Sequence, residues 1–60
     1  MYNVHTVMPS GARSIGYDHD KEEDAAAAHV RIAEQMRSLG MSGSSVVTEF
    51  AEIEVERTEI

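Results

Sequence analysis

Cysteine and tryptophan are absent from this sequence of 60 residues, and proline occurs once. Without cysteine the chain has no disulfides, no thiolate zinc site and no thiol chemistry. A chain of this size buries only about 60% of the surface that its unfolded form exposes. We therefore expect one domain, spanning residues 1–60, that depends on an efficient small core, on oligomerisation, or on both.

Basic residues are also scarce. Five Lys or Arg residues stand against eleven Asp or Glu residues, which gives a formal net charge of -6 at pH 7. Contact with a nucleic-acid backbone or an anionic membrane requires clustered basic residues, so we expect neither nucleic acid nor membrane as a partner. The sequence has no apolar run near the ~20 residues of a membrane span and no signal-peptide pattern at its start. These absences predict a cytoplasmic location.

Two short segments of alternating polarity near the N-terminus predict a β-hairpin. They span residues 2–8 and residues 13–18. Between them, Pro9 has a fixed φ and Gly11 can adopt a positive φ, which suits a turn. The two segments are therefore expected to form antiparallel strands.

The register of this hairpin decides which side chains meet the rest of the fold. Pairing Val4 with Tyr17 and Met8 with Arg13 gathers one set of larger side chains on one face, namely Tyr2, Val4, Met8, Ile15 and Tyr17. A slip by one residue would move the set to the opposite face, so we expect this register. The two tyrosines could stack bases on an exposed sheet, but we expect the helix to cover their face.

The helix between the strands has the clearest signals. Asp20 and Glu23 have the spacing of a capping box, and the four alanines at 25–28 have the highest helix propensity. Gly40 can adopt the left-handed conformation that ends many helices. Together these signals predict a helix over residues 21–39. Its apolar stripe, which we expect to cover the sheet, consists of Ala25, Ala28, Ile32, Met36 and Leu39.

The C-terminal segment is rich in β-branched residues and predicts one long strand over residues 46–58. No Gly, Pro, Asn or Asp occurs in residues 46–60, which disfavours a hairpin there. The apolar positions change phase, and a β-bulge near residues 49–52 accommodates the change. Such a strand is about twice as long as either hairpin strand, so we expect its C-terminal half to lack a partner within the chain.

These elements predict a small α+β fold of ββαβ topology. We expect a three-stranded antiparallel sheet in the order 2-1-3, with a single helix covering one face through a right-handed crossover. The unmatched length of the last strand favours a homodimer formed through that strand. The topology itself indicates no particular chemistry.

The polar residues do not have the spacing of a catalytic or metal centre. His29 has only alanine or isoleucine at its i±3 and i±4 positions, and the cluster at residues 18–20 fits the start of a helix. We expect His5 to face outward beside Gly16, where a ligand could approach, although such a histidine is more often a plain surface residue of its strand. Without an oligomer, a unit of one helix and three strands is also too small for a pocket of ~300 Å³. We expect a protein that is not an enzyme and has no cofactor; a metal site of histidine and carboxylates is the least favoured alternative.

Two groups of residues are candidates for contact with a protein partner. Small side chains form a second apolar line on the helix, and the end of the long strand combines apolar and acidic side chains. The candidate partner-binding residues are Ala26, Val30, Ala33, Glu52, Ile53, Glu54, Val55 and Glu56. The favoured hypothesis is a small acidic interaction module that forms a homodimer by pairing residues 51–58 with the same segment, or with an edge strand, of a second copy.

An acidic inhibitor is the alternative hypothesis. In a continuous strand, Glu52, Glu54 and Glu56 lie on one face, and together with Glu49 they would take the place of phosphates. Short acidic proteins encoded by phages use such surfaces to mimic a nucleic-acid backbone and bind a basic host protein, and the likeness here is one of composition. Binding of this kind weakens steeply with salt.

Overall fold

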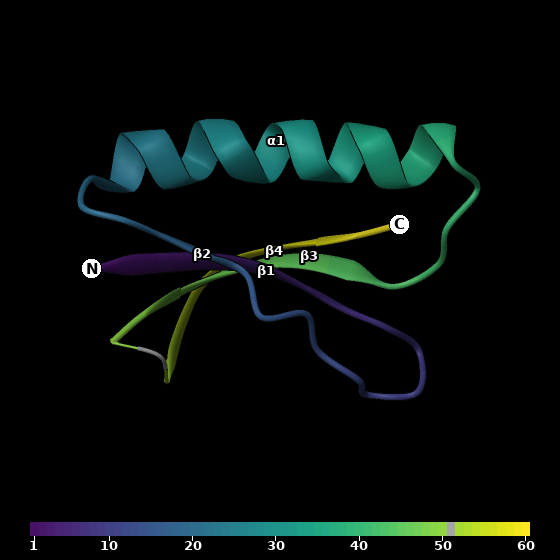
Figure 1. Ribbon diagram of the computed structural model, residues 1–60, viewed down its shortest axis with the longest axis horizontal. Coiled ribbons are helices and arrows are strands. Elements are labelled where there is room, and N and C mark those ends of the chain that lie inside the picture. Colours follow the sequence, from purple (N-terminus) through teal and green to yellow (C-terminus); the bar gives the residue numbers. More distant parts are fainter. Residues whose placement is uncertain (51) are drawn as a thin grey trace.

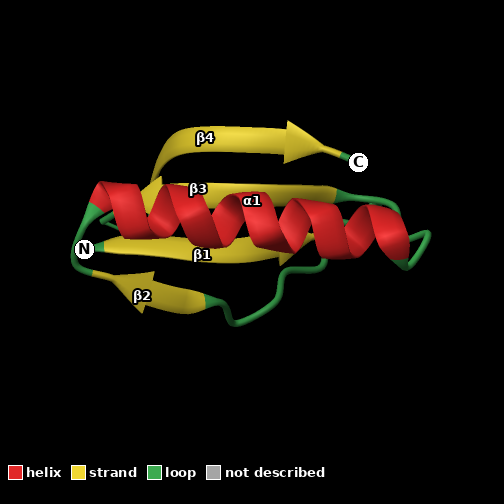
Figure 2. Ribbon diagram, turned by 90° about the horizontal axis from the view of Figure 1, so that it is seen from above, coloured by secondary structure: helices red, strands yellow, loops and turns green. Residues whose placement is uncertain are grey.

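One helix packs on one face of a four-stranded sheet in the computed structural model, which describes residues 1–50 and 52–60 (Figure 1). The elements in chain order are β1 (Tyr2–Val7), β2 (Tyr17–His19), α1 (Glu22–Ser38), β3 (Ser44–Glu49) and β4 (Ile53–Glu59). The strand order is β2-β1-β3-β4, and every neighbouring pair is antiparallel. Seen from above, α1 lies over β1 and β3, while β4 lies at one edge (Figure 2). The face opposite α1 is called the open face below.

The α+β class, the antiparallel sheet and the single covering helix are confirmed. The predicted number of three strands is wrong, because residues 46–58 do not form one strand. The chain reverses after Glu49, where Phe50 adopts a left-handed φ of 55° and the amide of Glu52 donates to the Glu49 carbonyl over 3.3 Å. β3 and β4 therefore pair with each other, and the sheet has four strands.

A β-bulge does occur, but not near residues 49–52. It lies on β4, where Val47 pairs with Glu56 and the next residue, Thr48, pairs with Glu54. Val55 is thus the additional residue on the β4 side. The change of phase seen in the sequence therefore combines a turn with a bulge in the returning strand.

The predicted register of the first hairpin is confirmed at one end and wrong at the other. Val4 pairs with Tyr17 as expected, but Arg13 forms its bridge with Val7 and not with Met8. The register changes at Gly16, which has a φ of 78°. As a result Ile15 does not join the face that meets α1 and is 97% exposed.

The helix is close to its predicted bounds, but its start is capped differently. Lys21 occupies the N-cap position and makes no side-chain hydrogen bond there, so the predicted capping box of Asp20 and Glu23 does not form. Three acidic residues in the first turn still place negative charge at the positive end of the helix dipole. The C-terminal prediction is confirmed, because Gly40 has a φ of 68° and the Met41 amide donates to the Met36 carbonyl over 2.9 Å.

The hydrophobic core is made mostly of small side chains. Its centre consists of Val4, Ala25, Ala28 and Val47, with Tyr2 and Ile32 packed against it. Leu39, predicted to belong to the buried stripe, is 65% exposed. Two other helix residues, His29 and Ala33, are buried in addition to the predicted alanines and Met36. α1 is therefore rotated toward β3 and β4 compared with the orientation that hydrophobicity alone predicts.

Candidate functional site

The outer edge of β4 is the longest strand edge without a neighbour among the described residues. β4 has seven residues and pairs only with β3, whereas the opposite edge strand, β2, has three. β4 also lies clear of the helix (Figure 2). An edge strand exposes backbone amide and carbonyl groups that can pair with another chain.

The bulge at Val55 divides this edge into two parts. Beyond it, Glu56 to Glu59 pair in regular register with β3. The bulge also separates the glutamates that a continuous strand would hold on one face. Glu54 lies opposite Thr48, which belongs to the open face, whereas Glu56 lies opposite Val47, which belongs to the face under α1. The expected acidic stripe is therefore split between the two faces.

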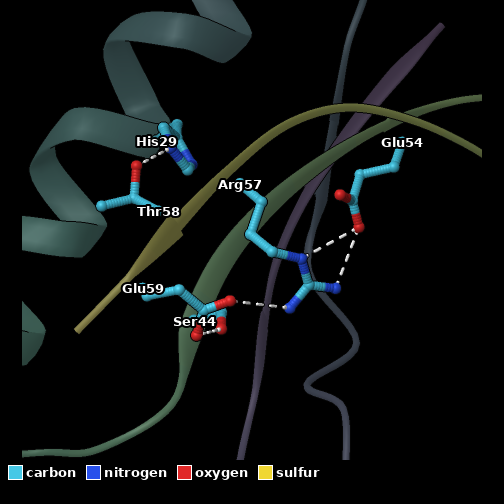
Figure 3. A network of polar contacts seen from close by, with 6 residues as sticks. All are labelled: His29, Ser44, Glu54, Arg57, Thr58 and Glu59. Carbon is cyan, nitrogen blue, oxygen red and sulfur yellow. Dashed lines mark hydrogen bonds and ion pairs between the residues drawn. The ribbon is translucent and has the colours of Figure 1, made fainter.

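His29 fixes the helix to β3 and β4 beneath this edge. Its Nδ1 lies 2.8 Å from the Ser45 hydroxyl and its Nε2 lies 2.7 Å from the Thr58 hydroxyl. A carboxylate oxygen of Glu56 lies 3.6 Å from the same Nε2, and the imidazole is only 1% exposed. Figure 3 shows the bond between His29 on α1 and Thr58 on β4. These bonds position β4 relative to the core although α1 does not cover it.

This network was not predicted, because His29 has no ligand partner on its own helix and its bonded hydroxyls are distant in sequence. A signal was present. His29 follows directly after the alanines that form the helix core, whereas Ser45 precedes the predicted strand of residues 46–58 and Thr58 is the last residue of that strand. Hydroxyl groups can donate to or accept from either imidazole nitrogen, so they are suitable partners for a buried histidine.

On the open face, β4 carries charges of alternating sign. The Arg57 guanidinium donates to one Glu54 carboxylate oxygen from Nε over 3.0 Å and from Nη2 over 2.9 Å. Its Nη1 lies 3.5 Å from Glu59, whose other carboxylate oxygen accepts from the Ser44 hydroxyl over 2.7 Å (Figure 3). The hydrogen bonds from Arg57 lower the pKa of Glu54. The open face of β4 thus presents an arginine between two carboxylates.

The candidate partner-binding residues do not form one continuous surface. Ile53 and Val55 on β4 are 56% and 41% exposed, and Val30 on the helix is 51% exposed. Ala33 is buried at 3% exposure, and Ala26 is half-buried. The remaining candidates, which are all exposed, are Glu52, Glu54 and Glu56. Of the two predicted groups, the one on β4 has the accessible side chains.

The chain also contains larger hollows than we expected. A cleft of about 310 Å³ lies between α1 and the first hairpin, with Ile32, Met36 and Tyr17 in its lining. Tyr17 is 77% exposed, although the register was expected to place it under the helix. The expectation that the unit is too small for such a pocket is therefore wrong. Because β2 is short and the register shifts at Gly16, this side of the sheet leaves the helix partly uncovered.

Comparisons of the chain with models of protein families, with curated proteins and with solved structures find no match. Within the described residues, no helix combines the length and the apolar character that a membrane crossing requires. The geometry of β4 and its neighbours is therefore the basis for a functional proposal.

Proposed function

We propose that the protein is a small, non-enzymatic, cytoplasmic interaction module that forms a homodimer through the outer edge of β4. The observation that carries the proposal is the unpaired edge of seven residues in a chain with a thin core. β3 and β4 pair within one chain, so no strand of unmatched length supports the dimer. Its support is the outer row of backbone groups on β4, which has no strand partner among the described residues.

Symmetry limits how two copies of β4 can pair. Two antiparallel copies of one edge strand are related by a two-fold axis perpendicular to the sheet, so one residue lies opposite its own copy. The regular part of β4 begins after the bulge, at Glu56. Pairing there, over residues 56–60, avoids the bulge that residues 51–58 would contain.

The charges on β4 favour one centre for this axis. With Thr58 at the centre, Arg57 of each copy lies opposite Glu59 of the other, and unlike charges directly opposite stabilise a strand pair. With Glu56 or Arg57 at the centre, that residue would lie opposite its own copy, and two like charges would face each other. The Thr58 register joins the two sheets into one and places both helices on the same side.

The outer edge of β4 also has features that limit its pairing with other strands while the protein is a monomer. Its charged side chains and its bulge are features that natural proteins use to limit uncontrolled edge pairing. A register that matches unlike charges is therefore selective for the second copy over other edges. Such selectivity distinguishes a specific dimer from aggregation.

An acidic inhibitor that mimics a nucleic-acid backbone is the second candidate. It needs several free carboxylates on one surface, but Glu54 and Glu56 lie on opposite faces and Arg57 binds Glu54. A dimer is therefore the better supported proposal. Salt-dependent capture of a basic protein by a monomeric chain would favour the inhibitor.

Light scattering after size exclusion, over a series of protein concentrations, tests the dimer. We expect a mass near twice 6.6 kDa at high concentration and dissociation on dilution. Glu59→Arg sets two guanidinium groups opposite each other and is expected to give a monomer. Glu34→Arg, which makes the same charge change at an exposed helix position, is the matched control and should leave the dimer intact. A monomeric wild type, or a Glu59→Arg variant as dimeric as the control, would contradict the proposal.

A further inference from the structure

A second feature lies on the open face, around His5. The segment that joins β1 to β2 and the hairpin of β3 and β4 both extend away from the sheet on this side (Figure 1). On this face, a cleft of about 220 Å³ lies between the joining segment and strands β1 and β3. Its lining consists of Asn3, His5, Arg13, Ser14, Ile15 and Thr48. His5 was predicted to be a surface residue, but it is only 6% exposed.

A chain of hydrogen bonds fixes the orientation and the tautomer of this imidazole. Nδ1 of His5 lies 2.8 Å from the amide oxygen of Asn3, and the amide nitrogen of Asn3 donates to Asp18 over 3.0 Å. An amide oxygen can only accept, so Nδ1 carries a proton. Nε2 is therefore the nitrogen that gains or loses a proton.

Nε2 of His5 has no hydrogen-bond partner within residues 1–50 and 52–60. In that same part of the chain, every fully buried side-chain nitrogen or oxygen has a partner. Nε2 must therefore retain access to solvent, and the cleft that His5 lines on the open face provides it. A buried, oriented imidazole with one accessible nitrogen is typical of a binding site.

The other polar groups of the cleft are donors. The Ser14 hydroxyl oxygen accepts from the Thr6 amide over 2.9 Å, which leaves its own proton to donate. Thr48 is 9% exposed, and its hydroxyl has no protein partner in the described residues. Arg13 forms no ion pair there either, so its guanidinium donors are free. Each of these groups can donate to an acceptor oxygen, and the Arg13 guanidinium can do so with charge-assisted bonds.

We propose that the cleft around His5 binds a small oxyanion, the carboxylate or phosphate group of a small molecule, between the imidazole and the Arg13 guanidinium. The hydroxyls of Ser14 and Thr48 supply further donors to the same oxygens. The cleft lies on the open face, and binding does not require a dimer. A failure to bind an oxyanion and a failure to form the dimer are therefore separate results.

Binding of an anion is coupled to protonation of His5. Burial lowers the pKa of His5, the charges of Arg13 and Arg57 lower it further, and Glu54 opposes them. Asp18 acts on the ring through Asn3. The empty cleft therefore holds a neutral imidazole at neutral pH, whose Nε2 lone pair repels an anion. An oxyanion favours the protonated ring, so it binds with uptake of one proton and binds more tightly at acidic pH.

Nuclear magnetic resonance of the histidine ring nitrogens tests this site directly. Inorganic phosphate and acetate are titrated separately, and chloride at equal ionic strength is the control for screening. We expect saturable shifts at His5 with a rise in its pKa, and no comparable change at His29, whose two nitrogens are already bonded within the fold. Acetate is expected to bind several-fold more tightly at about pH 5.5 than at about pH 7.5.

A pair of arginine variants identifies the cleft as the source of these shifts. Arg13→Gln removes the guanidinium, and loss of a charged hydrogen bond is expected to weaken binding by about tenfold or more. Arg31→Gln makes the same change at an exposed position of α1 and should have no effect. Both positions are exposed, so neither substitution removes core packing.

Each outcome decides the proposal. Saturation with phosphate alone identifies a phosphate site, saturation with acetate alone identifies a carboxylate site, and saturation with both identifies a general oxyanion site. The proposal is overturned if neither probe saturates, if chloride reproduces the shifts, or if Arg13→Gln binds as tightly as Arg31→Gln.

Discussion

Replacing Thr58 by valine removes the hydroxyl that bonds Nε2 of His29 while retaining the size of the side chain. The imidazole is 1% exposed, so water cannot replace the lost partner. A buried polar group that loses its partner costs about 1–3 kcal/mol. The carboxylate of Glu56, 3.6 Å from the same nitrogen, can recover part of that loss. We therefore expect Thr58→Val to lower the free energy of unfolding by about 1–2 kcal/mol.

The control for this prediction is Thr58→Ser, which keeps the hydroxyl and loses one methyl group. Full burial of such a group contributes about 0.8 kcal/mol, and Thr58 is only half-buried, so a smaller loss is expected. In a domain of this size, 1 kcal/mol changes Tm by about 4–8 °C. Thermal and urea unfolding followed by circular dichroism, at a concentration where light scattering gives a single mass, will resolve the two variants.

A double-mutant cycle attributes the loss to the bond itself. In a His29→Phe background Nε2 is absent, so Thr58→Val should cost almost nothing there. A Thr58→Val variant as stable as Thr58→Ser, or a loss of stability that is unchanged when His29 is phenylalanine, would show that the bond between Thr58 and His29 does not stabilise the fold.

Three further predictions concern the backbone and pH. Gly16→Ala should be more destabilising than Gly11→Ala in urea unfolding. Both glycines have positive φ, but a Cβ added at Gly16 would lie 2.5 Å from the Val4 carbonyl oxygen, whereas a Cβ added at Gly11 would meet nothing within 4 Å. Equal losses of stability would contradict the expected clash. Phe50→Asn should raise the free energy of unfolding by up to about 1 kcal/mol, because asparagine tolerates the left-handed φ and the Phe50 ring is 70% exposed. A loss of stability would show instead that the ring packs favourably. Folding lowers the pKa of His5, so the folded state favours the neutral imidazole. The stability that results is present above the unfolded pKa of 6.5 and is lost as the pH falls through and below that value. The stability difference between wild type and His5→Gln should therefore shrink from about pH 7.5 to about pH 5 in a buffer without oxyanions, and a difference that grows would contradict this sign.

The elements with strong local signals could be predicted from sequence. The alanines at 25–28 and Gly40 defined the helix and its end, and the pairing of Val4 with Tyr17 followed from which side chains share a face. These features depend on neighbours in sequence or on one hairpin. They are therefore accessible to arguments from periodicity and turn chemistry.

The second hairpin could not be predicted because its turn uses none of the usual residues. Phe50 adopts a left-handed conformation that residues with a Cβ normally avoid, and pairing of β3 with β4 compensates for that cost. The environments of His5 and His29 were missed for a related reason. Their partners, Asp18 for the chain from His5 and Thr58 for His29, are distant in sequence, and only the assembled sheet brings them together.

If two copies of β4 pair with Arg57 opposite Glu59, an exchange of these two charges should preserve the dimer. Arg57→Glu and Glu59→Arg each set like charges opposite each other across the proposed interface, so each should be monomeric. The double variant, Arg57→Glu with Glu59→Arg, restores unlike charges in the opposite order. Light scattering across a concentration series should therefore give monomers for both single variants and a dimer for the double variant. A double variant that remains monomeric while folded, or single variants that dimerise like the wild type, would contradict pairing in this register.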